Sequence, residues 1–335
     1  MVTLKHLAEQ LNVSVSTVSK ALNDSPEIGK DTIQRVKELA QHLNYQPNKM
    51  ALSLKSNKTN TLGVIIPDIL NHFFAKALYA IEMEAAKQGY NIITCVSNEL
   101  LSKEENSLQL LSNGSVDGFI MSLAEETQVK NNTAHISKVL DREMPMVLFD
   151  RVCDDLECDK VIIDDFGAAY EATKHLLKEG RKYIVLVSDI EDLSVGKLRT
   201  NGYLKALEED KRYKQEPVVV SVTKDDDLEQ VIDHLFLSNE KVDGILSIDN
   251  TSGVVALHKA LKKGYSIPEK LSIIGFSDKN VLVFTEPKLS TISQHTFDIG
   301  KASVKLIIDR LNQKSKTEPV TTTIKTKLVL RGTTK

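Results

Sequence analysis

Residues 2–23 decide the first part of the fold, and they read VTLKHLAEQLNVSVSTVSKALN. Apolar side chains recur at helical spacing in both halves of this stretch, and the two runs meet at a turn, Asn12-Val13. Thr3 and Ser14 stand just before the runs, where a hydroxyl can accept a hydrogen bond from a free helical N–H group. The pattern predicts a small three-helix unit whose apolar faces are formed by Leu4, Leu7, Ala8, Leu11, Val18, Ala21, Leu22, Ile33, Val36, Ala40 and Leu43.

The second predicted helix carries an unusual polar face. With about 100° of rotation per residue, Ser16 and Lys20 point away from the apolar face, and Val15, Thr17 and Ser19 lie on its flanks. A solvated helix usually mixes Glu and Lys on such a face, whereas this one holds hydroxyl groups and one cation. An ordinary helical hairpin with a solvated face remains the alternative, but the composition favours a helix that reads the edges of DNA bases.

Charge is distributed unevenly along the chain. The 335 residues have a net charge of −3, but residues 1–60 contain eight Lys and Arg against five Asp and Glu. The rest of the chain therefore has a balance of −6. A basic N-terminal unit on an acidic body predicts contact with phosphate groups at one end only.

Cysteine usage and hydropathy exclude several classes of protein. Cys95, Cys153 and Cys158 are an odd number, and the last two lack His or Cys neighbours at zinc-site spacing. We therefore expect reduced structural thiols, no metal and no cofactor. No apolar run approaches the ~18 residues of a membrane span, and charged residues interrupt the place where a signal peptide has its apolar core. These features predict a cytoplasmic protein with no membrane partner.

A basic segment follows the helical unit. Pro47 disfavours continuation of the third helix. Residues 48–60 then contain Lys49, Lys55 and Lys58, and their first half is long enough for about two helical turns, which are marginal in water. Two interpretations stay open: a flexible basic linker, or a helix that forms only when two copies pack together on DNA.

From residue 61 onward, short β-branched runs alternate with amphipathic helices. This alternation predicts parallel sheets covered on both faces, and the number of strands favours two doubly wound α/β subdomains with a cleft between them. Ligands in such folds bind beyond the carboxyl ends of strands. The segments in that position are residues 67–74, 150–151, 188–189, 249–250 and 277–278. Their aromatic rings, carboxylates, amides and arginine suit a sugar or another neutral polyol.

Two other classes of protein remain as alternatives. A solute-binding protein has this body, but it would need a signal peptide and would lack the helical head. An α/β enzyme acting on a sugar is the other. The chain contains no Gly-x-Gly-x-x-Gly after a strand, no Gly-x-x-x-x-Gly-Lys-Ser/Thr loop and no Gly-x-Ser-x-Gly elbow. His72, His175, His258 and His295 are scattered singly, so we expect no catalytic residues.

The motifs together resemble the lactose-repressor family (LacI/GalR) of bacterial transcription regulators over essentially the whole chain. The resemblance is carried by Val2-Thr3-Leu4, Val13-Ser14, Thr17-Val18-Ser19, Leu43-Asn44-Tyr45, Pro47-Asn48, Ala51, Leu54, Gly63, Pro67-Asp68, Gly202-Tyr203 and Gly275-Phe276. It implies a helix-turn-helix DNA-binding domain at 1–46, a hinge at 47–60, and an effector-binding and dimerisation domain at 61–335. That body would resemble periplasmic binding proteins, with one subdomain of about 61–161 plus 293–321 and another of about 162–292 plus 322–335.

Position by position, the resemblance implies a DNA-binding set. Val15, Ser16 and Lys20 occupy sites that read bases in the major groove, with Lys20 able to donate to guanine and Val15 able to touch a thymine methyl. Leu54 matches a hinge leucine that wedges into the minor groove. The full predicted set is Thr3, Ser14, Val15, Ser16, Thr17, Ser19, Lys20, Asn23, Thr32, Asn48, Ala51 and Leu54.

The resemblance also implies an effector site. Arg199, just before a helix predicted at Thr200–Asp210, matches an arginine that holds effector hydroxyls or a carboxylate in many members. The full predicted set is Asp68, Phe73, Phe74, Asp150, Arg199, Asp249, Asn250, Asp278 and Gln294. The pair Asp249-Asn250 is reversed relative to the common order, so no relative's effector can be transferred. Gly29 also stands where a Ser often caps the third helix.

The function implied is that of a sequence-specific DNA-binding repressor. Two chains would pair and present two heads to a near-palindromic operator. A small-molecule effector, expected to be a carbohydrate, would bind in the cleft and change operator affinity by reciprocal linkage. Induction is the commoner mode in the family, and corepression stays open. The heptad-rich tail of tetrameric relatives is absent before Lys335, so we expect a homodimer.

Overall fold

The computed structural model describes residues 2–45, 58–223, 226–238, 241–249, 251–278, 285–312 and 318–335. The chain forms two compact units, a head of residues 1–59 and a body of residues 60–335. Four residues of the predicted sites lie outside the described ranges: Asn48, Ala51, Leu54 and Asn250.

The head contains the three predicted helices, α1 (Leu4–Leu11), α2 (Val15–Leu22) and α3 (Lys30–His42). Their apolar stripes meet in one core, which is centred on the buried residues Leu7, Ala8, Val18, Ala21, Val36 and Ala40. Thr3 and Ser14 cap α1 and α2 through their side chains, as predicted, whereas Gly29 offers α3 no side-chain cap. The turn between α1 and α2 places Asn12 in the left-handed region, with φ of 53°.

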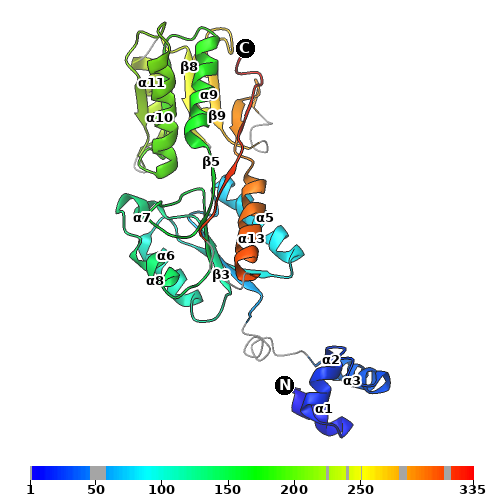
Figure 1. Cartoon of the computed structure of the whole chain (residues 1–335). Coiled ribbons are helices and arrows are strands. Elements are labelled where there is room, and N and C mark those ends of the chain that lie inside the picture. The colour runs from blue at the N-terminus through cyan, green and yellow to red at the C-terminus, as the bar shows by residue number, and fades with distance from the viewer. Residues whose placement is uncertain are drawn as a thin grey trace. The chain divides into compact units, whose positions relative to one another are not determined.

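The body consists of two α/β subdomains, each built on a six-stranded sheet (Figure 1). In the first subdomain the strand order is β11-β5-β4-β3-β1-β2, and all pairs are parallel. Its strands are β1 (Thr61–Ile66), β2 (Asn91–Val96), β3 (Gly118–Met121), β4 (Met146–Phe149), β5 (Asp159–Ile163) and β11 (Thr321–Ile324). Its helices are α5 (His72–Lys87), α6 (Leu101–Leu111), α7 (Glu125–Val129), α8 (Ala134–Leu140) and α13 (Thr296–Asn312).

In the second subdomain the strand order is β12-β10-β9-β8-β6-β7, and only β12 with β10 is antiparallel among the described pairs. Its strands are β6 (Ile184–Ser188), β7 (Val218–Ser221), β8 (Gly244–Ser247), β9 (Ser272–Phe276), β10 (Ser290–Ser293) and β12 (Lys327–Val329). Its helices are α9 (Asp165–Lys178), α10 (Ser194–Glu209), α11 (Leu228–Ser238) and α12 (Ser252–Lys262).

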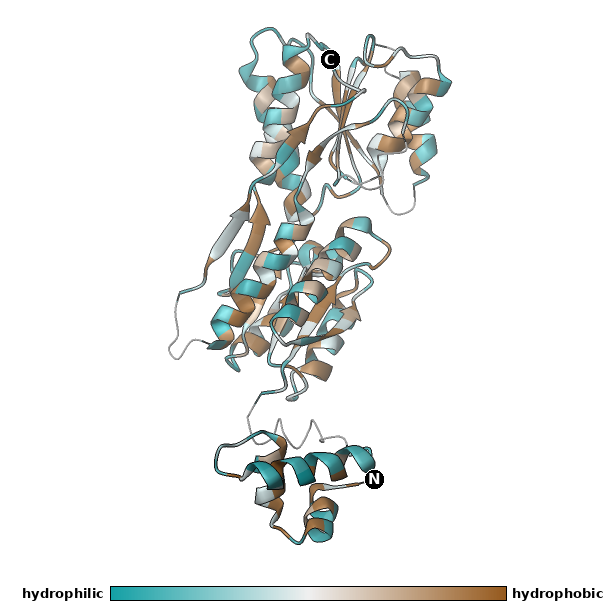
Figure 2. Ribbon diagram, turned by 90° about the vertical axis from the view of Figure 1, so that its right-hand side faces the viewer, coloured by the Kyte–Doolittle hydropathy of each residue, from teal (hydrophilic) through white to brown (hydrophobic). Residues whose placement is uncertain are grey.

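Helices cover both faces of each sheet, which explains the continuous apolar runs of the inner strands β1, β3, β4, β6, β8 and β9 (Figure 2). In β1, Val64 packs with α5 and α13 on one face, and Ile65 packs with α6 and α8 on the other. In β6, Val185 faces α11 and α12, whereas Leu186 faces α9 and α10. The two-subdomain α/β architecture predicted from the alternating pattern is therefore confirmed.

The chain passes between the subdomains at residues 163–165, 293–296 and 324–327. Parallel strands end at the same edge of each sheet, so the loops after β1–β4 and after β6–β8 are brought towards the space between the subdomains. This topology places side chains that are far apart in the sequence around one cleft.

Candidate functional site

The exposed face of α2 holds the side chains predicted to read bases. Ser16 and Lys20 are exposed and Val15 is 44% exposed, whereas Val18 on the opposite face is fully buried. The Lys20 ammonium forms an exposed ion pair with Glu27, which follows α2. The sequence did not single out Glu27, because the loop that folds it back towards α2 has no periodic pattern.

A cluster of hydroxyl groups surrounds the N-terminus of α2. Ser14 Oγ accepts a hydrogen bond from Thr17 N at 3.0 Å. It also lies 2.8 Å from Ser16 Oγ and 2.8 Å from Thr17 Oγ1. Free N–H groups and the positive end of the helix dipole make such a site favourable for a phosphate.

The other described head residues of the predicted DNA-binding set are Thr3, Ser19, Asn23 and Thr32. Thr3 is exposed and its Oγ1 accepts from His6 N at 3.3 Å, so this hydroxyl marks the N-terminus of α1. The exposed Asn23 side chain donates to the Ser19 carbonyl at 2.8 Å, and Thr32 is half-buried in the first turn of α3. Each polar group is thus available on the surface or already stabilises a helix end.

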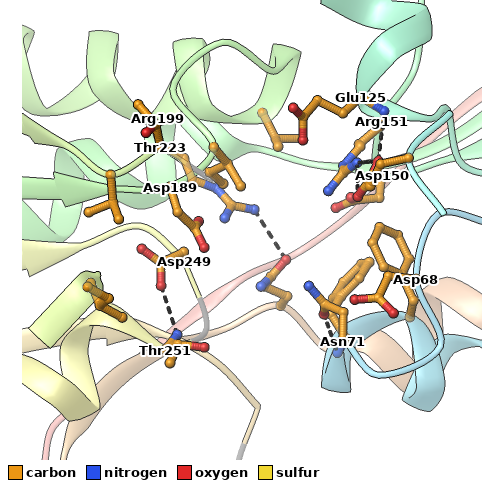
Figure 3. A pocket seen from close by; sticks show the side chains of 18 residues that line it. Asp68, Asn71, Glu125, Asp150, Arg151, Asp189, Arg199, Thr223, Asp249 and Thr251 are labelled. Carbon is orange, nitrogen blue, oxygen red and sulfur yellow. Dashed lines mark hydrogen bonds and ion pairs between the residues drawn. The ribbon is translucent and has the colours of Figure 1, made fainter. Parts of the chain in front are cut away.

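In the body, a cavity of about 330 Å³ lies between the two subdomains (Figure 3). It is lined by Asp68, Asn71, Phe73, Phe74, Glu99, Glu125, Asp150, Arg151, Asp189, Ile190, Val195, Arg199, Val222, Thr223, Leu228, Asp249, Thr251 and Gln294. Seven members of the predicted effector set are among them: Asp68, Phe73, Phe74, Asp150, Arg199, Asp249 and Gln294. The topology has therefore brought most of the predicted residues around one space.

An aromatic wall comes from the start of α5. Asn71 Oδ1 accepts from Phe73 N at 3.0 Å and so caps this helix. The rings of Phe73 and Phe74 are in edge contact, with centroids 5.3 Å apart. The Arg151 guanidinium lies 5.1 Å from the centroid of Phe74. Apolar ring surface beside fixed polar groups is the usual composition of a small-molecule pocket.

Arg199 is buried within α10 and is held on several sides. Its Nε donates to Asp165 Oδ1 at 2.7 Å, and its Nη1 donates to the Ile248 carbonyl at 2.7 Å. Its Nη2 donates to Gln294 Oε1 at 3.3 Å, and the guanidinium lies 4.2 Å from the centroid of the Phe276 ring. A guanidinium has five N–H donors, so Arg199 joins elements of the second subdomain to the chain crossing and still has donors for a ligand.

Arg151 is the second arginine of the cavity. Its Nη1 donates to both carboxylate oxygens of Glu99, at 2.9 and 2.7 Å. Glu99 Oε2 also accepts from Glu125 N at 2.7 Å. One carboxylate therefore ties together the loops that follow β2, β3 and β4. Glu99 and Glu125 were absent from the predicted set, because this contact joins residues 52 positions apart.

Two acidic side chains of the cavity have raised pKa values. Burial raises the pKa of Asp150 to about 6, against the opposing charge of Arg199. Asp189 keeps an exposed side chain but lies in the cleft. Loss of hydration there, together with the nearby Asp249 carboxylate, raises its pKa to about 7. Figure 3 shows Asp150 on one side of the cavity and Asp189 on the other. The cleft is thus a place where further negative charge is unfavourable.

Asp249 has a structural role beside its place in the cavity. Its Oδ1 accepts from Thr251 N at 2.8 Å and from Ser252 N at 2.7 Å, and its Oδ2 accepts from Ser252 Oγ at 2.6 Å. This carboxylate organises the start of α12, as residues that follow strands often do.

Asp278, another member of the predicted effector set, does not line the cavity. Its carboxylate accepts from Gln294 N at 2.9 Å and Thr296 N at 2.8 Å, and it pairs with Lys76 Nζ at 2.9 Å. Burial opposes ionisation, but hydrogen bonds from Thr296 and Lys76 hold the pKa of Asp278 well below its usual range. The structure therefore places this carboxylate at the chain crossing between β10 and α13, where it braces the two subdomains.

The part of the chain that the structure describes contains no cluster of side chains that could bind a metal ion and no helix that could span a membrane. Within these residues, three or more His, Cys, Asp or Glu side chains never gather in a way that could hold an ion. None of the helices found there is both long and apolar enough to cross a bilayer.

Comparison with protein families gives two matches that together span nearly the whole chain. Residues 3–48 match the model described as bacterial regulatory proteins, lacI family. Residues 59–331 match the model described as periplasmic binding proteins and sugar binding domain of LacI family. The two matches correspond to the head and the body.

Individual relatives agree with this assignment. The ribose operon repressor of Halalkalibacterium halodurans is 30% identical, over 100% of this chain and 98% of its own. A LacI family transcriptional regulator from Enterococcus faecium, solved with bound ribose, is 27% identical, with a TM-score of 0.70 over 82% of this chain and 98% of its own. The lac repressor dimer bound to operator and the anti-inducer ONPF has a TM-score of 0.86 over 99% of each chain, at 20% identity, and so supports the fold. These relatives are regulators and not enzymes.

Proposed function

We propose that this chain, which belongs to the lacI family of bacterial regulatory proteins, is a cytoplasmic repressor that binds a near-palindromic operator as a homodimer. Residues 1–46 bind DNA, 47–60 form the hinge, and 61–335 bind an uncharged sugar and dimerise. The observation that carries the sugar-binding part is the 330 Å³ cavity between the carboxyl ends of two sheets. Its size lies at the lower end of the roughly 300–1,000 Å³ range of ligand pockets.

The DNA-binding part rests on the exposed face of α2. The hydroxyl cluster of Ser14, Ser16 and Thr17 suits phosphate and base-edge contacts, and Lys20 suits a guanine. The fold likeness to a dimeric repressor bound to operator supports a symmetric site. Selection of binding sequences from random duplexes by the full chain should therefore return two inverted half-sites. Recovery of a single asymmetric motif would contradict the dimeric mode of binding.

The proposed effector is uncharged because the cavity has no unpaired cation to offer an anion among its described residues. Arg151 is paired with Glu99, and Arg199 is paired with Asp165. Six of the described lining residues are carboxylates: Asp68, Glu99, Glu125, Asp150, Asp189 and Asp249. A phosphate or carboxylate group would meet like charges in a partly desolvated site, which is costly. Hydroxyl groups instead find both acceptors and the remaining arginine donors.

The experiment is a comparison of matched sugars on the full chain. D-ribose is the first probe, because two relatives are named for ribose or hold it. D-ribose should raise the melting temperature and change affinity for the selected operator, since a ligand that binds the folded state stabilises it. D-ribose 5-phosphate, which adds only charge and bulk, should do neither. A stronger response to the phosphate ester would overturn the assignment of an uncharged effector, and conversion of the sugar would favour the enzyme alternative.

A further inference from the structure

One direct contact between the subdomains lies away from the chain crossings. It joins α7 of the first subdomain to the first residue of α10 in the second. Gln128 Nε2 donates to Ser194 Oγ at 2.9 Å, and Ser194 N donates to Gln128 Oε1 at 3.2 Å. Figure 1 places α7 at the side of the first subdomain opposite α13, which follows a crossing.

The contact supplies what α10 lacks in its own sequence. The N-cap position of α10 is Leu193, whose side chain cannot accept a hydrogen bond. The first N–H groups of a helix need acceptors from outside the helix. Gln128 provides one for Ser194, so the cap of a helix in one subdomain comes from a side chain of the other.

Gln128, on the first-subdomain side of this contact, is fixed in position. Gln128 Nε2 also donates to the Val152 carbonyl at 3.0 Å. The fully buried Glu104 accepts from Ala124 N at 2.6 Å and from Thr127 Oγ1 at 2.7 Å, which anchors the start and middle of α7. Gln128 therefore moves with the first subdomain.

Ser194, on the second-subdomain side, is connected to the cavity through α10. Val195, the residue after Ser194, lines the cavity, and so does Arg199 on the next turn of α10. Rotation of the subdomains about the crossings would separate α7 from α10, because α7 lies on the side of the first subdomain opposite α13, which follows a crossing (Figure 1). The cap would then be lost at the moment the cavity opens.

We propose that Gln128 is a positioning residue for effector binding, which caps α10 across the cleft and so holds Val195 and Arg199 in place only while the subdomains are closed. The inference rests on the proposed function in that the cavity is taken as the effector site. Neither Gln128 nor Ser194 is among the residues that line the cavity, so the role is exerted through α10.

The first test needs no ligand and uses amide hydrogen exchange of the full chain. Gln128→Ala should speed exchange at residues 194–197 by about tenfold, the effect of losing one or two net hydrogen bonds. Gln128→Glu keeps an oxygen that can accept from Ser194 N but loses the Nε2 donor to the Val152 carbonyl, so it should restore only part of the protection. Gln109→Ala removes an exposed glutamine side chain of α6 in the same subdomain and should change nothing there. Unchanged exchange at 194–197 in Gln128→Ala, or an equal rise throughout the body, would overturn the proposal.

The second test uses D-ribose on the same variants. Gln128→Ala should weaken D-ribose binding about tenfold while Gln109→Ala leaves it intact, and Gln128→Glu should lie between Gln128→Ala and the parent chain. Equal ribose affinity in Gln128→Ala and the parent would overturn the positioning role. If the parent chain binds no sugar, the proposed effector fails, and the exchange experiment still decides whether Gln128 caps α10.

Discussion

The head and the cleft use their polar side chains in opposite ways. On the head, Ser16 and Lys20 are exposed and are contacted only by groups near them in the chain, among the residues described. In the cleft, Arg151 and Arg199 are buried, and each is held by a carboxylate from a different element. The head can therefore present side chains that its own fold does not need, whereas the side chains of the cleft also hold the fold together. Binding and stability should therefore separate on the head and be coupled in the cleft.

The largest effect is expected at Arg199. Arg199→Ala leaves the buried Asp165 carboxylate without its cation, and breaking a buried pair in this way costs about 3–5 kcal/mol. Asp165 is 4% exposed, so little water can replace the guanidinium. We expect that loss in the free energy of unfolding of the body, measured by urea denaturation, together with loss of sugar binding.

Arg212→Ala is the matched control for this variant. Arg212 also pairs with an aspartate, Asp210, but its side chain is 74% exposed. Its removal should leave the free energy of unfolding nearly unchanged, because solvent screens the pair. Similar losses in the free energy of unfolding for Arg199→Ala and Arg212→Ala would show that the buried arginine of the cleft is no more important for stability than an exposed one.

The next effect is expected on the head. Lys20→Ala should weaken operator binding by about 1–3 kcal/mol and relax preference at one base pair in each half-site. The stability of the head should stay nearly constant, because the exposed pair with Glu27 contributes little. Binding should be measured on operators varied at each position, at one salt concentration. An equal loss on every sequence would place Lys20 on a phosphate.

A smaller effect concerns the pH dependence of the cleft. The pKa of Asp150 is raised to about 6 by burial, so the folded chain binds a proton more tightly than the unfolded chain. This carboxyl therefore lowers stability as pH rises from about 4 to about 6, and the loss is complete above the folded pKa. Asp150→Asn should raise the free energy of unfolding at pH 8 by on the order of 1 kcal/mol, after allowance for partial exposure.

The measurement is a pair of urea titrations of Asp150→Asn and the parent chain, at pH 5 and pH 8. The gain from the substitution should be larger at pH 8, where the carboxyl would otherwise be ionised. An equal gain in the free energy of unfolding at pH 5 and pH 8 would mean that Asp150 does not titrate between these pH values. Burial of its charge would then not destabilise the cleft.

The elements of the fold that could be predicted from the sequence are those with a strong local pattern of apolar residues. The head follows from apolar spacing, because three short helices share one small core. Gly89, Gly180 and Gly264, which follow α5, α9 and α12, have φ of 79°, 86° and 80°, the left-handed conformation in which many helices end. The edge strand β11 was not predicted, because its half-exposed sequence, TTTI, has little apolar signal.

The start of α10 was predicted at the wrong residue for a different reason. The sequence placed the helix from Thr200, whereas it begins at Ser194 and includes Gly196. A glycine within a helical pattern normally weakens the prediction of a helix. Here a Cβ at Gly196 would collide with the Ile190 carbonyl, so close packing of the backbone requires glycine. Likewise, Asp165 and Arg199 are 34 positions apart, and only the tertiary fold brings them into contact.

The smallest effect is expected on the head, where a substitution next to α3 should change the stability of that helix alone. Gly29 precedes α3 with φ of −61° and ψ of 144°, and a Cβ there would meet nothing within 4 Å. Gly29→Ser should supply the missing cap and stabilise α3 by about 0.5 kcal/mol. Slower amide exchange across α3 in the full chain, with unchanged exchange in α10, would agree. Gly29→Ala separates the causes, because it restricts the unfolded chain without adding a hydroxyl. Equal protection by Ala and Ser would show that the hydroxyl does not cap α3.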